Sequence, residues 1–233
     1  TVYGVDDLSG GFMHNVTQKR YFTKLDLRDR AKTATYIKKI KPEIIFHLAA
    51  DAAEGRSQFT PFSALDRNLV VYYNLLIPAI KHGIKKMILT SSMSVYGGQQ
   101  VPFKESMEPK PEDIYGISKT AMEATTKVLS DVYGFAHVII RPHNVYGPRQ
   151  NLTDPYRNVI GIFINRLLSE KNFYIYGDGQ GIGISGHIIG SKHGGKRWYK
   201  QIYDLQFSRI NIRGYIGCCT LYCDTVYPIR QTE

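Results

Sequence analysis

The sequence predicts an α/β fold with a doubly wound parallel (Rossmann-like) sheet, truncated at its amino-terminal end and followed by an irregular carboxyl-terminal tail. Short apolar runs alternate with longer helical runs up to about residue 176. Polar segments follow two of the apolar runs, and the tail shows neither a helical nor a strand period. Such alternation is typical of a parallel sheet with helices on both faces.

The expected elements follow one another in a regular order. Strands are expected at residues 1–5, 21–25, 43–48, 86–90 and 136–140, and helices at residues 28–41, 62–82 and 113–133. Pro42 ends the first helix because proline cannot continue the backbone hydrogen bonding. Gly83 and Gly134 fit the carboxyl-terminal stops of the other two helices. Pro78 predicts a kink or an early stop inside the second helix.

Composition limits the class of protein. A hydrophobic content of 43% indicates a globular chain with a core. No apolar run approaches the roughly 18–20 residues of a membrane span. Three cysteines give no disulfide framework, which favours a reducing, cytoplasmic location. The net charge of +10 favours anionic partners. Basic residues at helix ends explain much of this charge without nucleic acid.

A serine, a tyrosine and a lysine occur in the order that hydride-transfer chemistry on a sugar alcohol requires. Ser92 follows the apolar run 86–90, and Tyr115 and Lys119 lie four apart, on one face of the expected helix. A phenol titrates near about pH 10 in water, and a neighbouring ammonium is expected to lower that pKa. An exposed tyrosine and a solvated lysine would show the same spacing. The serine at the strand's carboxyl end favours a general-base site.

The acid that ends the first expected strand predicts which cofactor binds and where. Asp6 can bind both hydroxyls of an adenosine ribose and would repel a 2′-phosphate, which favours NAD over NADP. The alternative is a turn formed by Asp6 and Asp7. In the dinucleotide fold a glycine-rich turn lies about 20 residues before this acid. Counting back from Asp6 passes the start of the chain, so we expect an amino-terminal truncation.

The tail differs from the rest of the chain, and residues 181–233 are expected to be a separate, atypical segment that is out of frame or unrelated in sequence. Residues 181–186 match G-x-G-x-x-G but open no helix, so they make a poor phosphate site. Cys218, Cys219 and Cys223 do not have the spacing of a zinc site, and no metal is expected.

Several motifs in the expected order resemble one known family. They are the segments 5–9, 25–29, 47–50, 90–97, 115–119, 141–148 and 176–179, together with Asn68. The chain resembles the extended short-chain dehydrogenase/reductase family over residues 1–180. Within that family it is most similar to the nucleotide-sugar epimerases of the UDP-galactose 4-epimerase type.

The resemblance implies a role for each matching residue. Tyr115 would take the proton of the sugar C4 hydroxyl, Lys119 would hold the nicotinamide ribose, and Ser92 would hydrogen-bond the same sugar oxygen. The implied cofactor-binding residues are Asp6, Asp7, Asp26, Leu27, Leu48, Ala49, Ala50, Asn68, Tyr115, Lys119 and His143. The implied substrate-binding residues are Ser92, Asn144 and Asn158. NAD would be regenerated in each cycle through a 4-keto sugar.

Other activities stay open at this point. A nucleotide-sugar dehydratase needs an added acid and base within the two residues after the serine. Met93 and Ser94 stand there and do not titrate usefully, so epimerisation is favoured. A reductase, or a non-catalytic dinucleotide- or RNA-binding remnant, is a further alternative. Ala52 stands where the epimerase has a cofactor-contacting lysine. The two long helices, 62–82 and 113–133, are where a homodimer would form.

Overall fold

The computed structural model describes residues 1–143, 145, 147, 149–154 and 159–172. The chain divides into two compact units. The first contains Thr1–His143, and the second contains the helix α6 (Val159–Leu168). The expected boundary at residue 180, the glycine motif at 181–186 and the cysteines of the tail all lie outside the described residues.

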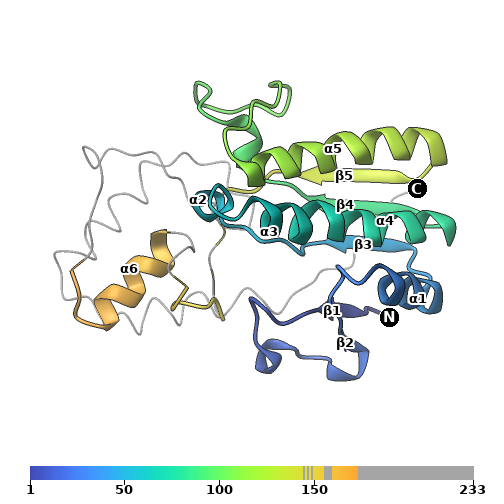
Figure 1. Cartoon of the computed structure of the whole chain (residues 1–233), viewed down its shortest axis with the longest axis horizontal. Helices are drawn as coiled ribbons and strands as arrows, with labels where there is room; N and C mark the ends of the chain where they lie inside the picture. Colours follow the sequence, from blue (N-terminus) through green and yellow to red (C-terminus); the bar gives the residue numbers. More distant parts are fainter. Residues whose placement is uncertain (144, 146, 148, 155–158, 173–233) are drawn as a thin grey trace, which may run out of the picture. The chain divides into compact units, whose positions relative to one another are not determined.

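The five expected strands are present, and all of their described pairings are parallel (Figure 1). β1 (Gly4–Asp6) pairs with β2 (Phe22–Lys24). β3 (Ile44–His47), β4 (Lys86–Thr90) and β5 (Ala136–Ile140) form a second sheet in the order β3-β4-β5. The prediction of a parallel α/β sheet is therefore confirmed.

Two of the three expected helices form as single elements. They are α1 (Arg30–Ile40) and α5 (Ile114–Tyr133). The Asp29 side chain caps α1 by accepting from the Lys32 backbone N–H at 3.0 Å. Gly134 ends α5 in the left-handed conformation at φ 73°, as a carboxyl-terminal glycine commonly does.

The expected helix at 62–82 is subdivided. It consists of α3 (Pro61–Leu65), a π-helical turn (Asp66–Val70) and α4 (Val71–Lys81). The expected early stop at Pro78 is wrong, because α4 continues for three residues beyond it. A short helix that the sequence did not predict, α2 (Glu54–Ser57), precedes α3.

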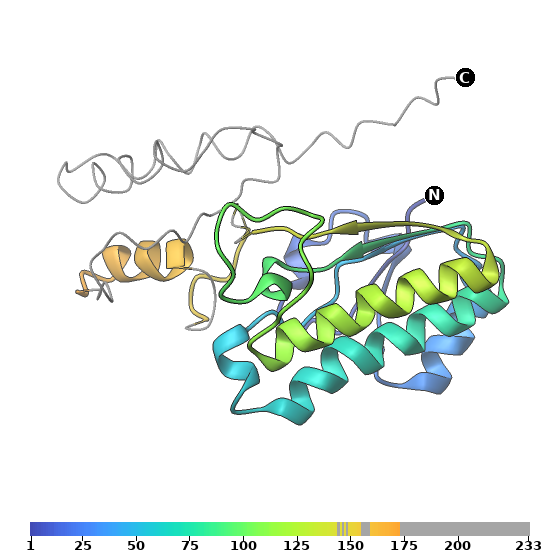
Figure 2. The same ribbon diagram turned by 90° about the horizontal axis from the view of Figure 1, so that it is seen from above.

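The core of the first unit lies between the helices and one face of the β3-β4-β5 sheet. Its most deeply buried apolar side chains include Tyr72, Leu76, Met87, Leu89 and Met122. α1, α4 and α5 all lie on this side of the sheet (Figure 2). The opposite face carries apolar side chains that are exposed, including Ile44, Phe46, Val138 and Ile140. Among the described residues of this unit, helices thus cover one face and not both.

None of the described helices combines the length and the apolar character that a bilayer crossing requires.

Candidate active site

Ser92 lies where β4 ends and is nearly buried, with 6% of its surface exposed. It caps a 3₁₀ turn (Met93–Tyr96), and its Oγ accepts from the Ser94 backbone N–H at 3.1 Å. β5 fixes the chain on either side, because Ser91 N donates to Ile140 O at 2.7 Å and Met93 N donates to Pro142 O at 3.2 Å. The serine hydroxyl is therefore held at the carboxyl edge of the sheet.

The first turn of α5 packs closely against the 3₁₀ turn that follows Ser92. The Asp113 side chain caps the helix by accepting from Gly116 N at 2.7 Å. A Cβ added at Gly116 would lie 2.8 Å from the Ser94 backbone oxygen, closer than real side chains come. Glycine at 116 thus permits the close approach that brings Tyr115 beside Ser92.

Ser92, Tyr115 and Lys119 are brought together, as the sequence reasoning expects. Ser92 lies close enough to the Tyr115 phenol to lower its pKa. The Lys119 ammonium lies 5.6 Å from the centroid of the Tyr115 ring and donates to the Thr90 backbone oxygen at 2.8 Å. Tyr115 is 5% exposed and Lys119 is 1% exposed. The three polar groups form one cluster in a site that is largely shielded from water.

The electrostatics of this cluster differ from the expectation. Burial raises the pKa of the Tyr115 phenol, and the opposing influence of Ser92 does not offset that effect. The carboxylates of Glu54, Asp113 and Asp51 raise this pKa further. Burial also lowers the pKa of Lys119 to about 8. The expected lowering of the phenol pKa by the ammonium alone is therefore wrong, because desolvation and three carboxylates outweigh it.

A buried ion pair between Glu123 and Arg141 contacts Ser91, the residue before Ser92. The Glu123 carboxylate accepts from the Ser91 hydroxyl at 2.5 Å and from Arg141 Nη2 and Nε at 2.6 and 2.9 Å. The two side chains of the ion pair are 3% and 12% exposed. Because Glu123 lies four residues after Lys119, the same face of α5 carries the cluster and its anchor.

His143 lies at the end of a row of aromatic rings. Arg141 lies over the ring of Tyr96 at 4.8 Å, Tyr96 stacks on Phe103 at 4.7 Å, and Phe103 is stacked 6.3 Å from His143. Burial lowers the pKa of His143. Its buried Nδ1 has no hydrogen-bond partner among the described residues.

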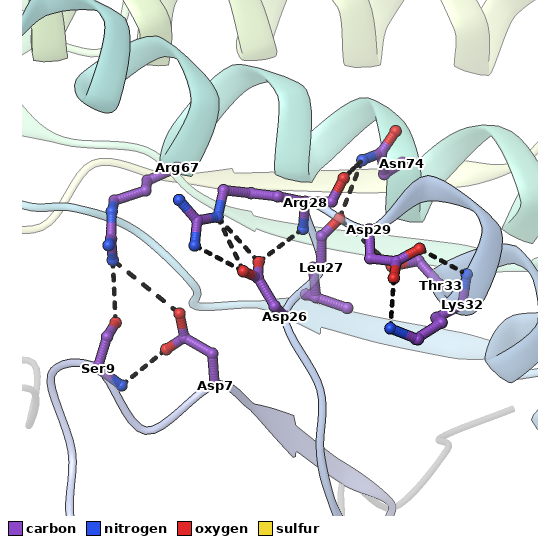
Figure 3. Close-up of polar contacts among 10 residues, drawn as sticks. All are labelled: Asp7, Ser9, Asp26, Leu27, Arg28, Asp29, Lys32, Thr33, Arg67 and Asn74. Atoms are coloured by element: carbon purple, nitrogen blue, oxygen red, sulfur yellow. Dashed lines mark hydrogen bonds and ion pairs between the residues drawn. The ribbon is translucent and has the colours of Figure 1, made fainter.

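The predicted ribose-binding acids are the last residue of β1, Asp6, and the residue that follows it, Asp7. Asp6 accepts from Leu8 N at 2.6 Å, and Asp7 accepts from Ser9 N at 2.8 Å, so both side chains stabilise the turn. Arg67 reaches this turn and donates to Ser9 Oγ at 3.1 Å (Figure 3). The turn-forming role is thus present, and it leaves the second oxygen of each carboxylate without a described hydrogen bond to a backbone N–H.

The predicted adenine-side residues follow β2. Asp26 binds Arg28 through both of its oxygens, and this interaction lowers the pKa of the carboxyl (Figure 3). Leu27 is buried, and its backbone oxygen accepts from Thr33 at 3.3 Å and from Asn74 at 3.0 Å. These contacts fix the backbone that would line an adenine pocket.

The remaining predicted residues fall into two groups. Leu48, Ala49 and Ala50 follow β3 at the carboxyl edge, where a pyrophosphate would pass, and Leu48 is 72% exposed. Asn68 is fully buried, and its amide binds Asp51 N at 3.0 Å and Ala64 O at 2.7 Å. Its described contacts are thus with the backbone of Asp51 and of Ala64 in α3, and the cofactor contact stays a prediction.

Asn144 and Asn158, the predicted substrate asparagines, lie outside the described residues.

One carboxylate that the sequence reasoning missed reaches the cluster. Glu54 Oε1 accepts from the Ser94 hydroxyl at 2.8 Å, and Ser94 Oγ lies 3.0 Å from Ser92 Oγ. The search for an acid near the serine covered only the next two residues, whereas Glu54 comes from the segment after β3. Its position beyond a strand's carboxyl end was the available signal. No group of three or more metal-ligating side chains occurs among the described residues.

Comparison with known proteins gives the family. Residues 1–182 match the NAD dependent epimerase/dehydratase family, so the chain belongs to that family. It is 36% identical over 187 residues to a UDP-glucose 4-epimerase of Mycolicibacterium smegmatis, covering 76% of this chain and 58% of that protein. A putative UDP-glucose 4-epimerase of Methanocaldococcus jannaschii is 33% identical over 179 residues, covering 75% of this chain and 57% of that protein.

Solved structures agree with this assignment. A UDP-glucose 4-epimerase from Thermotoga maritima, solved with UDP-glucose, superposes with a TM-score of 0.72 at 33% identity, covering 76% of this chain and 59% of that one. The Thermus thermophilus UDP-glucose 4-epimerase, solved with NAD, gives 0.66 at 31% identity, covering 72% of this chain and 55% of that one. The expected family and fold class are confirmed. The chain spans less than three-fifths of the length of these relatives.

Proposed function

We propose that this chain carries the catalytic part of an enzyme that epimerises a nucleotide sugar, a UDP-hexose, at C4 through a 4-keto sugar. The observation that carries the proposal is the cluster of Ser92, Tyr115 and Lys119 at the carboxyl end of β4. The relatives that are UDP-glucose 4-epimerases support the same reaction.

The described residues fit NAD at both ends of the site. Asp6 and Asp7 would offer carboxylate oxygens to the adenosine ribose, and Lys119 and His143 would lie at the nicotinamide end. NAD, when bound, would supply the hydride acceptor for the sugar C4. A positive charge beside the phenol would oppose the carboxylates that raise the pKa of Tyr115.

The protein's own groups handle the proton. Tyr115 takes the proton from the sugar C4 hydroxyl as the hydride leaves C4, and it returns a proton after the hydride has added to the other face. Ser92 hydrogen-bonds the same sugar oxygen and holds it beside the phenol. Lys119 holds the nicotinamide ribose and fixes its distance from Tyr115. The low exposure of all three residues keeps water away from the keto sugar.

A nucleotide-sugar dehydratase is the second candidate, because Glu54 supplies a carboxylate close to Ser94. The two activities give different products, since a dehydratase releases water from C5 and C6 and an epimerase conserves every atom of the sugar.

The experiment is to incubate the chain with NAD and either UDP-glucose or UDP-galactose, and to analyse the sugars. Interconversion of the two sugars is expected, with a loss of about 10²–10⁴-fold in Tyr115→Phe, the usual contribution of a general base. Tyr133→Phe is the matched control, because Tyr133 is 60% exposed at the end of the same helix. A 4-keto-6-deoxy product would establish the dehydratase instead. Equal turnover in Tyr115→Phe and the unaltered chain would refute the assigned base.

We further propose that two copies pair through α4 and α5. These helices are joined by a hydrogen bond of 2.7 Å between Tyr73 and Thr125, and α5 carries exposed apolar side chains at Ile117, Val128 and Val132. Light scattering is expected to give twice the chain mass, and Val128→Asp is expected to give the monomer. A monomer before substitution would refute the pairing. The cytoplasmic location stays a prediction.

A further inference from the structure

The loops on the cofactor side of the site leave two different sheets. β1 and β2 pair with each other, whereas β3 pairs with β4 in the second sheet. Among the described residues, no strand of one sheet pairs with a strand of the other. The distances between the loops that follow β1, β2 and β3 are therefore set by contacts other than a backbone ladder.

Two buried asparagines after α3 hold two of these loops. Asn68, in the π-helical turn, accepts from the backbone N–H of Asp51 at 3.0 Å, in the loop after β3. Asn74, in α4, donates to the backbone oxygens of Leu27 and Arg28 at 3.0 Å each, in the loop after β2 (Figure 3). Both asparagines are buried, so water competes little for these hydrogen bonds. One helical segment thus holds loops of both sheets.

Arg67 connects the third loop to the same helical segment. Its Nη1 donates to Ser9 Oγ at 3.1 Å and lies 4.0 Å from Asp7 Oδ2 (Figure 3). The Ser9 backbone N–H donates to Asp7 Oδ1 at 2.8 Å, so the guanidinium contacts both residues that close this turn. Consecutive residues of a helix point in different directions, so Arg67 and Asn68 reach loops of different sheets. The Arg67 side chain is 34% exposed, so water can replace its contact more readily than those of the asparagines.

We infer that Arg67 is a positioning residue for the adenosine part of the dinucleotide, because it ties the turn at Asp6 and Asp7 to the helix that holds the other two loops. The inference rests on the proposed function, in which these acids bind the ribose. Arg67 acts before the cofactor arrives, by keeping the turn in its binding conformation. A turn that is closed only part of the time lowers the apparent affinity in proportion to the closed fraction. Holding the turn in advance also reduces the conformational entropy that is lost on binding.

The first test needs neither cofactor nor turnover. NMR relaxation of the full chain gives order parameters for the amides of Leu8 and Ser9, both of which donate to carboxylates of this turn. They should be about 0.85 in the unaltered chain, and Arg67→Ala should lower them below about 0.6. Arg30→Ala is the matched control and should leave them unchanged, because Arg30 is exposed at the start of α1. Unchanged order parameters in Arg67→Ala overturn the inference.

The second test measures NAD binding by isothermal titration calorimetry. Arg67→Ala is expected to weaken NAD binding about fivefold, because the turn is closed for a smaller fraction of the time. It should leave kcat at saturating NAD unchanged. Ser9→Ala removes the other half of the same contact, so the double variant should bind NAD no more weakly than Arg67→Ala alone. No loss in Arg67→Ala, or losses that multiply in the double variant, overturns the inference.

The two measurements also separate the role of Arg67 from the proposed function. An unaltered chain that binds NAD but does not turn over UDP-glucose would refute the proposed function alone, because the order parameters and the NAD affinities still decide the role of Arg67. An unaltered chain that binds no NAD would overturn the inference itself.

Discussion

The catalytic end and the ribose end of the first unit are held in different ways. At the catalytic end, Tyr115, Lys119 and Glu123 are at most 5% exposed and bind partners on other elements of the fold. At the ribose end, Asp7 and Asp26 bind groups two residues further along the chain, and the Asp26 side chain is 40% exposed. Buried contacts between distant segments fix the first region, whereas local turns and exposed ion pairs hold the acids of the second.

This difference predicts where substitutions will act on stability. Groups at the catalytic end are desolvated, so their charges carry large free energies in either direction. Groups at the ribose end are screened by water, so their ion pairs contribute little. Four substitutions test the contrast.

The largest loss of stability is expected at the buried ion pair. Glu123→Gln leaves Arg141 buried without its countercharge, which should lower the free energy of unfolding by about 3–5 kcal/mol in urea denaturation. Glu43→Gln is the control, because its pair with Lys85 is exposed and water screens it, so its loss should change the free energy of unfolding very little. Equal losses in the two variants would contradict the contrast.

The Glu123–Arg141 pair also predicts that the free energy of unfolding depends on pH. Burial raises the pKa of Glu123, but hydrogen bonds from Arg141 and Ser91 outweigh it and leave the pKa below its ordinary value. The carboxylate therefore stabilises the fold above the unfolded pKa of about 4.3, and that contribution is lost as the pH falls. The stability gap between the unaltered chain and Glu123→Gln should close in acid. A gap that widens in acid would refute this reading.

Burial of the Lys119 ammonium is expected to lower the free energy of unfolding, although the proposed reaction needs this residue. Its pKa is lowered to about 8 by burial, so the unfolded chain binds the proton more tightly. Lys119→Met should raise the free energy of unfolding at pH 7 by about 2–3 kcal/mol and abolish turnover. In the unaltered chain stability should rise between about pH 8 and pH 10.4. Lys127 lies on the exposed side of α5, so Lys127→Met should change neither the free energy of unfolding nor turnover.

His47 should give a smaller effect that appears only in acid. Burial and the nearby charge of Lys119 lower its pKa to about 3, so it stays neutral in the fold. The unfolded chain gains a proton below about pH 6.5, so stability falls by about 2 kcal/mol between pH 7 and pH 5. His47→Leu should remove most of that loss, and His14→Leu, which is exposed, should not. If His47→Leu loses as much stability between pH 7 and pH 5 as the unaltered chain, His47 is not the cause of that loss.

The smallest effect is expected at the ribose end. Arg67→Ala removes the contact with Ser9 and a 4.0 Å pairing with Asp7, and the Arg67 side chain is 34% exposed. The free energy of unfolding should change by less than about 1 kcal/mol. A loss as large as that of Glu123→Gln would show that the ribose loop is held as firmly as the catalytic end.

The sequence predicted the features that repeat or lie close together. Alternating apolar runs gave the five strands, and the four-residue spacing placed Tyr115 and Lys119 on one face of α5. The break at Asp66–Val70 was not predicted, because a π turn leaves no clear mark in apolar periodicity.

Features that depend on contacts between distant segments could not be predicted from the sequence. Glu54 and Ser94 are 40 residues apart, so no local motif contains both. The direction of the Tyr115 pKa was mistaken for the same reason. Spacing revealed the ammonium one turn away, whereas burial and the carboxylates of Glu54 and Asp51 come from other parts of the chain.

The most direct test of the central proposal is reduction of the cofactor by the sugar. The chain is mixed with NAD and UDP-glucose, and reduced nicotinamide is followed by its absorbance and fluorescence. The proposed chemistry predicts reduced nicotinamide in the unaltered chain and in Tyr133→Phe, and none in Tyr115→Phe with NAD still bound. Equal reduction in Tyr115→Phe, or none in the unaltered chain, would contradict it.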